Sequence, residues 1–317
     1  MDPLSDVLRA VRLTGAYFYM VEATHPWSVL TVEAKKLVPR VHPAAEHLIS
    51  YHILTSGNCW GGVAGEQQTL MQPGDAIVFP HGDANLLSSL QTRVADAPTL
   101  SATPERFPNN VLLNPGPGAK ATFVCGFLGC DLRPFNPLLS SLPRQIIARG
   151  GPGDWLAEFP KYALAESREP KPGSESMLTR MAELMFVEVL RRHVASPSGG
   201  SRETGWLVGL GDPIVGPALR ALHDKPEHAW TLPDLAREIG TSRTVLVERF
   251  ATVVGVPPMQ YLTQWRLQLA ADQLARGSAK VASIGARVGY ESEAAFSRAF
   301  KRATGLSPSA WRDARQA

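Results

Sequence analysis

Cysteine is scarce in this chain, whose 317 residues include only Cys59, Cys125 and Cys130. Three cysteines are too few for the disulfide framework of a small secreted protein, and free thiols are the default in a reducing compartment. Long apolar runs are also missing, since no stretch approaches the roughly 18 residues of a membrane span. Residues 1–6 lack the basic region and apolar run of a signal peptide. We therefore expect a cytoplasmic protein with no membrane partner.

A large excess of one charge is absent too, because 32 Lys and Arg residues stand against 29 Asp and Glu residues. The distribution along the chain is nevertheless uneven. Residues 214–317 contain 14 basic and 9 acidic residues, whereas the remainder contains 18 and 20. A basic C-terminal third is what we expect if that part alone meets nucleic acid. A modestly basic solvated surface is the alternative interpretation.

The N-terminal part combines a short amphipathic helix with many short strand-like runs. Residues 3–12 place four apolar side chains on one helical side. β-Branched and apolar runs follow, and glycines at 57, 61, 62 and 65 are expected to form turns between them. The expected strand runs are residues 27–37, 47–54, 70–82, 110–113 and 121–128. Many short strands with glycine turns predict a barrel or a sandwich.

Several short motifs stand out in this part: Tyr51-His52, residues 57–60, the Pro73-Gly74-Asp75 turn, residues 79–82, and Cys125-Gly126 followed by residues 137–143. Together they resemble the cupin domain that serves as the sensor of AraC-type regulators. Enzymatic cupins hold a metal with a His-x-His pair, a Glu and a later His. This sequence departs from that pattern: His42, His47 and His52 are spaced by five, and Asn85 stands where a histidine often lies. Residues an odd number apart on a strand face opposite sides. We therefore predict no metal and no cofactor.

Five residues are candidates for an effector or redox site in this domain: His52, Cys59, His81, Cys125 and Cys130. Cys125 and Cys130 bracket two glycines, Gly126 and Gly129, that would permit a bend bringing the thiols together. One hypothesis is an oxidant or electrophile sensor that uses the cysteines as a switch. The other is that the thiols are buried and inert.

The middle of the chain is expected to be helical and then flexible. Residues 174–193 carry methionines and aliphatic residues at helical spacing. This apolar face would fill an intramolecular core or contact a second copy, and the AraC resemblance implies a homodimer. Residues 196–212 are rich in glycine and serine and are expected to form a linker. It would separate a cupin-like domain, residues 1–195, from a DNA-binding domain, residues 213–317.

The C-terminal domain contains an internal repeat of two helix-turn-helix units, residues 232–254 and 281–304. Eight matched positions lie 49 or 50 residues apart, and Gly240 matches Gly289 in the turns. Each turn is followed by a helix with one apolar and one polar-basic face. Residues 257–276 are expected to form a central helix, apolar on two sides and about 30 Å long. That length would place two recognition helices in successive major-groove segments.

The signature from Gly289 to Pro308 closely resembles the DNA-binding domain of the AraC family of transcriptional regulators. It reads Gly-Tyr-x-Ser-x-x-x-Phe-Ser-Arg-x-Phe-Lys, followed by Gly305-x-Ser307-Pro308. The resemblance implies binding to double-stranded promoter DNA and control of transcription through RNA polymerase. Glu248 departs from the family, in which many relatives carry a basic residue, so its readout would include an acceptor contact to cytosine or would be weak.

The residues expected at the DNA interface project from the two units. Arg243 and Arg298 are candidates for guanine or phosphate contacts, and Lys301, Arg302 and Arg287 for phosphate contacts. The full predicted set is Ser242, Arg243, Thr244, Val247, Glu248, Arg249, Arg287, Ser292, Glu293, Ala294, Ser297, Arg298, Lys301 and Arg302.

The sequence thus predicts an α+β protein, with a cupin-like β-barrel and flanking helices followed by an all-α domain of two helix-turn-helix units joined by a central helix. The predicted function is transcription regulation in response to a small-molecule or redox signal, without enzymatic activity. Two alternatives stay open at this point. One is a cupin enzyme with an accessory DNA-binding domain, and the other a constitutive regulator whose barrel only dimerises.

Overall fold

The computed structural model describes residues 2–11, 13–92, 99–100, 110–131, 134–151, 153–195 and 204–316. The chain forms two compact units. The sheet unit consists of Leu13–Asp131 and Leu142–Gly199. The helical unit consists of Met1–Arg12, Leu132–Ser141 and Gly200–Ala317, so it combines three separate parts of the chain.

The sheet unit contains two sheets, as expected from the many short apolar runs. The first has six strands in the order β11 (Ile146–Ala148), β6 (Ala76–Phe79), β3 (His47–Ser56), β10 (Lys120–Cys130), β1 (Leu13–Thr24), β9 (Asn110–Leu113). The second has five, in the order β5 (Thr69–Met71), β4 (Cys59–Val63), β7 (Asn85–Ser88), β2 (Ser28–Thr31), β8 (Thr99–Leu100). The β1–β9 and β2–β8 pairs are parallel, and the other pairs are antiparallel.

The core of this unit lies between the two sheets. Strand alternation sends Phe123, Cys125 and Phe127 of β10 into this core, where Trp27 stacks on Phe123 with ring centroids 5.3 Å apart. The described strands are hydrogen-bonded as two separate sheets and are not joined into one cylinder. The architecture is therefore cupin-like, with the sheets facing each other across an apolar interior.

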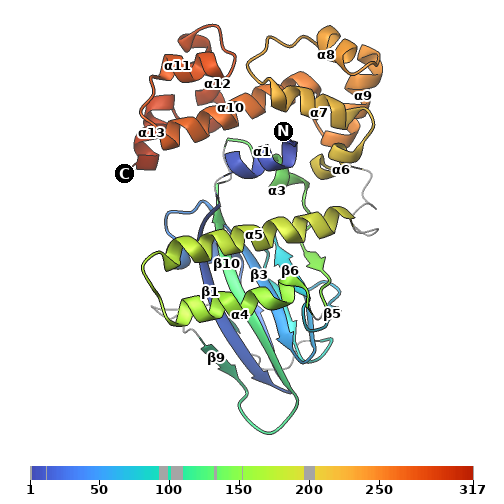
Figure 1. The fold of residues 1–317 in the computed structure, drawn as a ribbon, viewed down its shortest axis with the longest axis vertical. Coiled ribbons are helices and arrows are strands. Elements are labelled where there is room, and N and C mark those ends of the chain that lie inside the picture. The colour runs from blue at the N-terminus through green and yellow to red at the C-terminus, as the bar shows by residue number, and fades with distance from the viewer. Residues whose placement is uncertain are drawn as a thin grey trace. The chain divides into compact units, whose positions relative to one another are not determined.

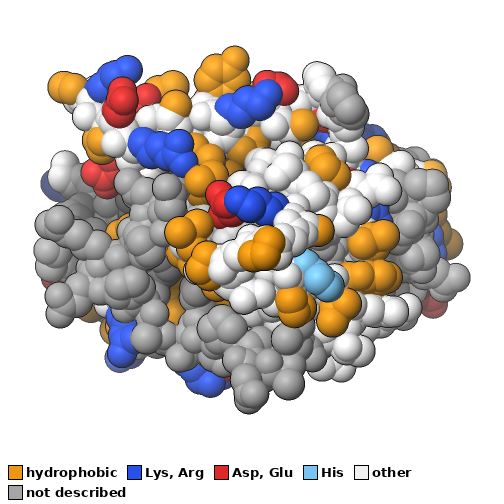
Figure 2. Space-filling view, turned by 90° about the horizontal axis from the view of Figure 1, so that it is seen from below, with side chains coloured by type: hydrophobic (Ala, Val, Ile, Leu, Met, Phe, Trp, Pro, Cys, Tyr) orange, Lys and Arg blue, Asp and Glu red, His pale blue; other side chains and the backbone are white. Residues whose placement is uncertain are grey.

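Two helices cover the outer face of the six-stranded sheet (Figure 1). They are α4 (Trp155–Arg168) and α5 (Ser174–Ala195), the second at the expected position. Phe159 of α4 lies 5.8 Å from Phe18 of β1, measured between ring centroids. Because β10 is covered on one side by the core and on the other by helices, nearly all of its residues are buried. Figure 2 shows one face of the molecule, on which hydrophobic side chains are interspersed with charged ones.

The helical unit is built on a long helix, α10 (Pro258–Arg276). The first helix-turn-helix comprises α8 (Leu232–Glu238) and α9 (Arg243–Val254), and the second comprises α11 (Val281–Arg287) and α12 (Glu293–Thr304). These helices lie within the ranges expected from the repeat. The unit also contains α1 (Pro3–Ala10), α3 (Pro137–Ser141), α6 (Trp206–Gly211), α7 (Val215–Asp224) and α13 (Pro308–Gln316).

The helix ends follow from local chemistry. Ser242 and Ser292 cap α9 and α12, each accepting a hydrogen bond from the backbone N–H three residues on. Gly255 and Gly305 end the same helices in the left-handed conformation that a Cβ opposes. The two recognition helices therefore share both cap types, as the repeat implies.

One buried glutamine holds two distant segments onto α10. Gln268 donates a hydrogen bond from Nε2 to the carbonyl oxygen of Ala10 (2.8 Å) and accepts one at Oε1 from the N–H of Phe135 (3.1 Å). The side chain is almost completely buried, so both bonds are protected from water. Helix α1 and the residues before α3 therefore belong to the helical unit, although we expected residues 1–195 to form one domain.

Two further expectations need correction. Residues 196–203 of the expected linker lie outside the described residues, but Trp206–Gly211 forms helix α6 because Trp206 and Leu207 are buried. Gly61 and Gly62, expected in a turn, lie inside strand β4. A Cβ on Gly61 would come within 2.9 Å of the side chain of Leu87 on the neighbouring strand β7, so this glycine allows close packing within the sheet.

Candidate DNA interface and buried polar cluster

Most of the predicted interface residues lie on the outer faces of α9 and α12, with Ser242 and Ser292 at the caps of these helices and Arg287 at the end of α11. Twelve of these residues are exposed, and Val247 and Ser297 are half-buried. The opposite faces are apolar and buried, through Leu246 and Phe250 in α9 and Phe296 and Phe300 in α12. This division leaves the polar-basic faces free to contact a ligand as large as a DNA groove. Val245, which we did not predict, is also exposed on α9.

Arg249 has an intramolecular partner that the sequence did not reveal. Its guanidinium contacts Oδ2 of Asp212 at 2.7 Å through both Nε and Nη2. Oδ1 of Asp212 accepts hydrogen bonds from the N–H groups of Ile214 and Val215 at 2.9 Å, which caps the start of α7. Burial opposes ionisation of Asp212, but these hydrogen bonds and Arg249 outweigh it and lower its pKa. Arg249 thus ties α9 to the segment before α7.

Helix α10 fixes the separation of the two units. Its 19 residues span about 28 Å at about 1.5 Å per residue. Leu267, Ala270, Ala271 and Leu274 join the core of the second unit, whereas Tyr261 contacts Phe250 of the first with ring centroids 5.7 Å apart. The helix is therefore buried from both sides, as its two apolar rows predict.

The sheet unit contains a polar cluster inside its apolar core, centred on His52. The imidazole Nε2 lies 3.1 Å from Oδ1 of Asn85, and Nδ1 lies 2.7 Å from Sγ of Cys125. Asn85 donates from Nδ2 to Ser50 Oγ and to the carbonyl oxygen of Asp83, which fixes its Oδ1 as the acceptor. His52 therefore donates from Nε2, and its Nδ1 accepts from the Cys125 thiol.

Burial keeps this imidazole neutral. It lowers the pKa of His52 to about 4, against a partial opposing effect of the hydrogen bond with Asn85. His47, on the same strand, bonds instead to the carbonyl oxygen of Pro80. His81 is exposed and bonds to the carbonyl oxygen of Leu142. Of the three histidines, only His52 belongs to the cluster, and no group of three or more potential metal ligands occurs among the described residues.

The three cysteines are free and buried. Burial raises the pKa of Cys59 to about 12, and it raises the pKa of both Cys125 and Cys130. Strand β10 keeps a continuous register with β3 from Cys125 to Cys130, so the bend that would bring these thiols together is absent from this strand. Instead, Gly126 makes room for its neighbours, because a Cβ there would lie 2.2 Å from the hydroxyl of Tyr51.

Comparison with known proteins places these features in a family. A family model described as Cupin matches residues 2–195, and one described as Helix-turn-helix domain matches residues 235–314. Two proteins described as putative AraC-like transcription regulators, from Streptomyces antibioticus and Streptomyces lividans, are 30% and 32% identical to this chain. In both cases the match covers 98% of this chain and 98% of the relative. The chain belongs to the AraC family of transcriptional regulators.

This AraC-family regulator is therefore a DNA-binding transcription regulator with a cupin-like domain, as its helix-turn-helix signature predicted. A solved structure of the DNA-binding domain of AdpA in complex with a target DNA is 30% identical over 33% of this chain and 94% of that chain, with a TM-score of 0.31. Among the described helices of this regulator, none combines the length and hydropathy that a membrane span requires.

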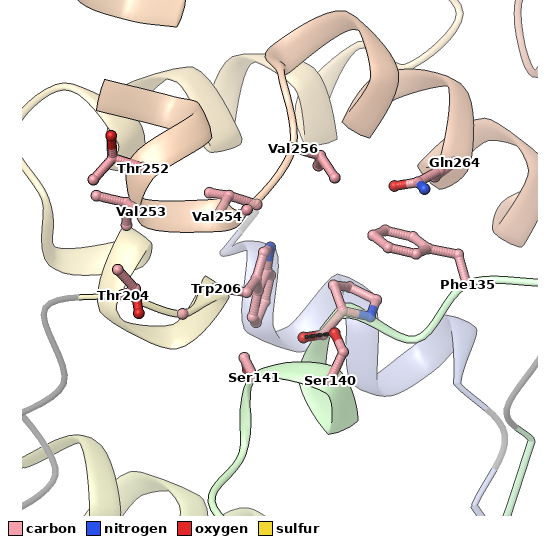
Figure 3. A pocket seen from close by; sticks show the side chains of 13 residues that line it. Phe135, Ser140, Ser141, Thr204, Trp206, Thr252, Val253, Val254, Val256 and Gln264 are labelled. Atoms are coloured by element: carbon pink, nitrogen blue, oxygen red, sulfur yellow. Dashed lines mark hydrogen bonds between the residues drawn. The ribbon is translucent and has the colours of Figure 1, made fainter. Parts of the chain in front are cut away.

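A hollow of about 380 Å³ lies within the helical unit (Figure 3). Phe135, Trp206 and Val256 contribute apolar surface to it, and Ser140, Ser141, Thr204, Thr252 and Gln264 contribute polar groups. The Oε1 atom of Gln264 is buried without a hydrogen-bond partner. Because all of its lining residues are uncharged, this hollow suits a neutral molecule with a hydrogen-bond donor.

Proposed function

We propose that α9 and α12 enter two successive major-groove segments of promoter DNA. The arrangement that carries this proposal is a pair of exposed, similarly capped helices joined by the buried 19-residue helix α10. Helix α10 is about 28 Å long, which approaches the roughly 34 Å of one DNA turn. A single chain would then read two adjacent segments on one face of the duplex.

Within this proposal the exposed side chains take different roles. Arg298 and Arg243 reach guanine edges or phosphates, and Thr244, Ser297 and Glu293 meet base edges. Lys301, Arg302 and Arg287 neutralise phosphates, which position the protein without specifying the sequence. Arg249 contributes less, because its guanidinium already pairs with Asp212.

Footprinting tests the two-segment proposal directly. Genomic fragments captured by the purified protein would supply the operator, and hydroxyl-radical footprinting would then report the protected positions. For each bound chain we expect a pair of protected segments about one helical turn apart on one face of the DNA. A single continuous or single-turn footprint from one chain would contradict the proposal.

We propose that a small molecule controls this regulator by binding to the sheet unit. Burial that keeps the thiols of Cys59, Cys125 and Cys130 protonated disfavours the alternative oxidant signal, since the thiolate is the reactive form. The His52 cluster offers a buried place where a ligand could exchange hydrogen bonds with the protein. We assign the regulator no catalytic activity, a cytoplasmic location and RNA polymerase as a partner implied by the family.

Ligand dependence separates a sensor from a constitutive regulator. The full-length protein should show a compound-dependent change in operator affinity together with a raised melting temperature. His52→Leu should abolish that response while leaving binding without the compound intact. Operator affinity that stays constant across a metabolite library would favour a constitutive regulator whose sheet unit only dimerises. Conversion of a compound to a product would favour a cupin enzyme with an accessory DNA-binding domain.

A homodimer through helix α5 completes the proposal. Ala182, Met185 and Phe186 face the sheet, but Met177 and Leu184 are 50% and 59% exposed. With Met181 they follow helical spacing and form an apolar stripe on the outer side of α5. A second copy of this stripe would bury it, in agreement with the dimer that the family resemblance implies.

A further inference from the structure

The loop between α7 and α8, residues 225–230, reaches from the first half of the helical unit to the middle of α10. Arg266 donates from Nε to the carbonyl oxygen of Pro226 (2.6 Å) and from Nη2 to that of His228 (2.7 Å). Arg266 lies near the midpoint of α10 and is half-buried. Two charge-assisted hydrogen bonds to backbone oxygens hold the loop against this helix.

The loop is ordered by its own contacts. The indole N–H of Trp230 donates to the carbonyl oxygen of Lys225 (3.0 Å), and the N–H of His228 donates to the same oxygen (3.2 Å). The rings of His228 and Trp230 lie edge to face with centroids 4.6 Å apart. These contacts within the loop, together with the helices at its two ends, hold its backbone in one conformation. The loop can therefore restrict the movement of the residues that pack against it.

Residues 225–230 and Arg266 also pack against the turn of the second helix-turn-helix. Gly289 has φ +85°, and a Cβ placed there would lie 2.7 Å from the Glu227 carbonyl oxygen and 2.8 Å from Nη2 of Arg266. The equivalent turn residue of the first unit, Gly240, has a similar φ of +70° but no atom within 4 Å of its Cβ position. The repeat therefore requires a glycine conformation in both turns, yet only the second turn is closely packed by the loop and Arg266.

We propose that Arg266 and residues 225–230 form a lock that sets the spacing between the two recognition helices. Helix α10 fixes the distance between the units, and the lock adds a second connection that limits twisting about the helix axis. The regulator would then bind with both helices only to operators of one spacing. On DNA of another spacing, the second recognition helix could not reach its groove segment while the first is bound, so the affinity gained from binding both segments would be lost. This inference rests on the proposed reading of two DNA segments by one chain.

The test varies the spacing of the operator that footprinting defines. Operators with one base pair inserted or deleted between the two protected segments move the second site by about 3.4 Å and rotate it by about 35°. For the full-length wild-type protein we expect affinity to fall about tenfold or more on such DNA. For Arg266→Ala the penalty should shrink to about threefold or less, with weaker binding at the native spacing.

Two controls match this variant. Arg220→Ala removes an exposed arginine elsewhere in the helical unit and should keep the wild-type spacing profile. Gly289→Ala should change the profile, whereas Gly240→Ala, which has the same conformational cost but free space, should not. If circular dichroism shows that Arg266→Ala does not fold, the two glycine variants decide alone.

The outcomes separate the lock from the proposed function. A wild-type protein whose affinity ignores spacing would overturn the two-segment reading and the lock with it. A wild-type protein that selects one spacing, together with Arg266→Ala and Gly289→Ala proteins that select it equally strongly, would overturn only the lock.

Discussion

At the scale of single residues, the DNA interface and the polar cluster differ in what surrounds each side chain. Arg298 and Lys301 are exposed on α12, so water competes for every contact they make until DNA excludes it. His52 is fully buried, so its ionisation state is set by the protein alone. Substitutions at the interface should therefore alter binding, and substitutions in the cluster should alter stability.

If Arg298 reads a guanine edge, as proposed, Arg298→Ala should weaken binding to the operator by about 1–3 kcal/mol with little change on scrambled DNA. Lys301→Ala should weaken binding to both DNAs, and the slope of log K against log salt concentration should become shallower by about 1. Fluorescence anisotropy at several salt concentrations measures both effects. Equal losses on operator and scrambled DNA for Arg298→Ala would reassign it to phosphate contact.

The His52 imidazole should make stability depend on pH. Its pKa is about 4 in the folded protein, below the roughly 6.5 of an unfolded chain, so the unfolded state takes up a proton first as the pH falls. Stability from this group is complete above pH 6.5 and is lost as the pH falls toward 4. Urea unfolding should show that wild type loses about 2 kcal/mol more than His52→Gln between pH 7 and pH 5. Parallel pH profiles for the two proteins would show that His52 titrates normally.

At the scale of elements, the recognition helices could be predicted from sequence and the sheet largely could not. The Ser and Gly caps and the repeated apolar spacing determine α9 and α12 locally, so their ranges were predictable. Gly61 and Gly62 indicate a turn by local rules, yet they lie in strand β4, where the side chains of Leu87 and Met71 approach from the strands on either side. That approach is a tertiary contact, which no local pattern encodes.

At the candidate site, too, local sequence patterns predict which residues are exposed but not which distant residues they contact. Which side chains project from α9 and α12 followed from helical periodicity alone. The pairing of Arg249 with Asp212, 37 residues away, depends on how α9 packs beside the start of α7. The contact of His52 with Cys125 depends on the register of β3 with β10, and its contact with Asn85 depends on how the two sheets pack, so sequence indicated the residues but not their hydrogen bonds.

The Asp212 cap provides a test at this scale. Asp212→Ala should destabilise the protein by about 2 kcal/mol, because it removes the acceptor for the buried N–H of Val215 and the half-buried N–H of Ile214 at the start of α7. Arg249→Ala leaves the cap in place and, with its side chain 47% exposed, should cost less than about 1 kcal/mol. Urea unfolding of both variants measures the difference. Equal losses would indicate that the ion pair, and not the cap, carries the stability.

At the scale of the whole molecule, the α5 stripe predicts the assembly state. Leu184→Glu places a charge in the proposed contact between two copies and should convert a dimer to a monomer, with a stability change within about 0.5 kcal/mol because the site is exposed. Sedimentation velocity measures the change, and Glu175→Gln at the exposed start of α5 serves as control. A Leu184→Glu protein that still sediments as a dimer would place the interface elsewhere.

The bond from Gln268 to Ala10 has a consequence for how the protein is made. Helix α1 leaves the ribosome early, but its partner is translated more than 250 residues later. At roughly 5–20 residues per second, that interval is on the order of ten to fifty seconds. The sheet unit ends at residue 199, well before Gln268, and can fold during this time. Closure of the helical unit around α1 is therefore a late event of biosynthesis, so the first helix of the chain reaches its final packing after the sheet unit that follows it.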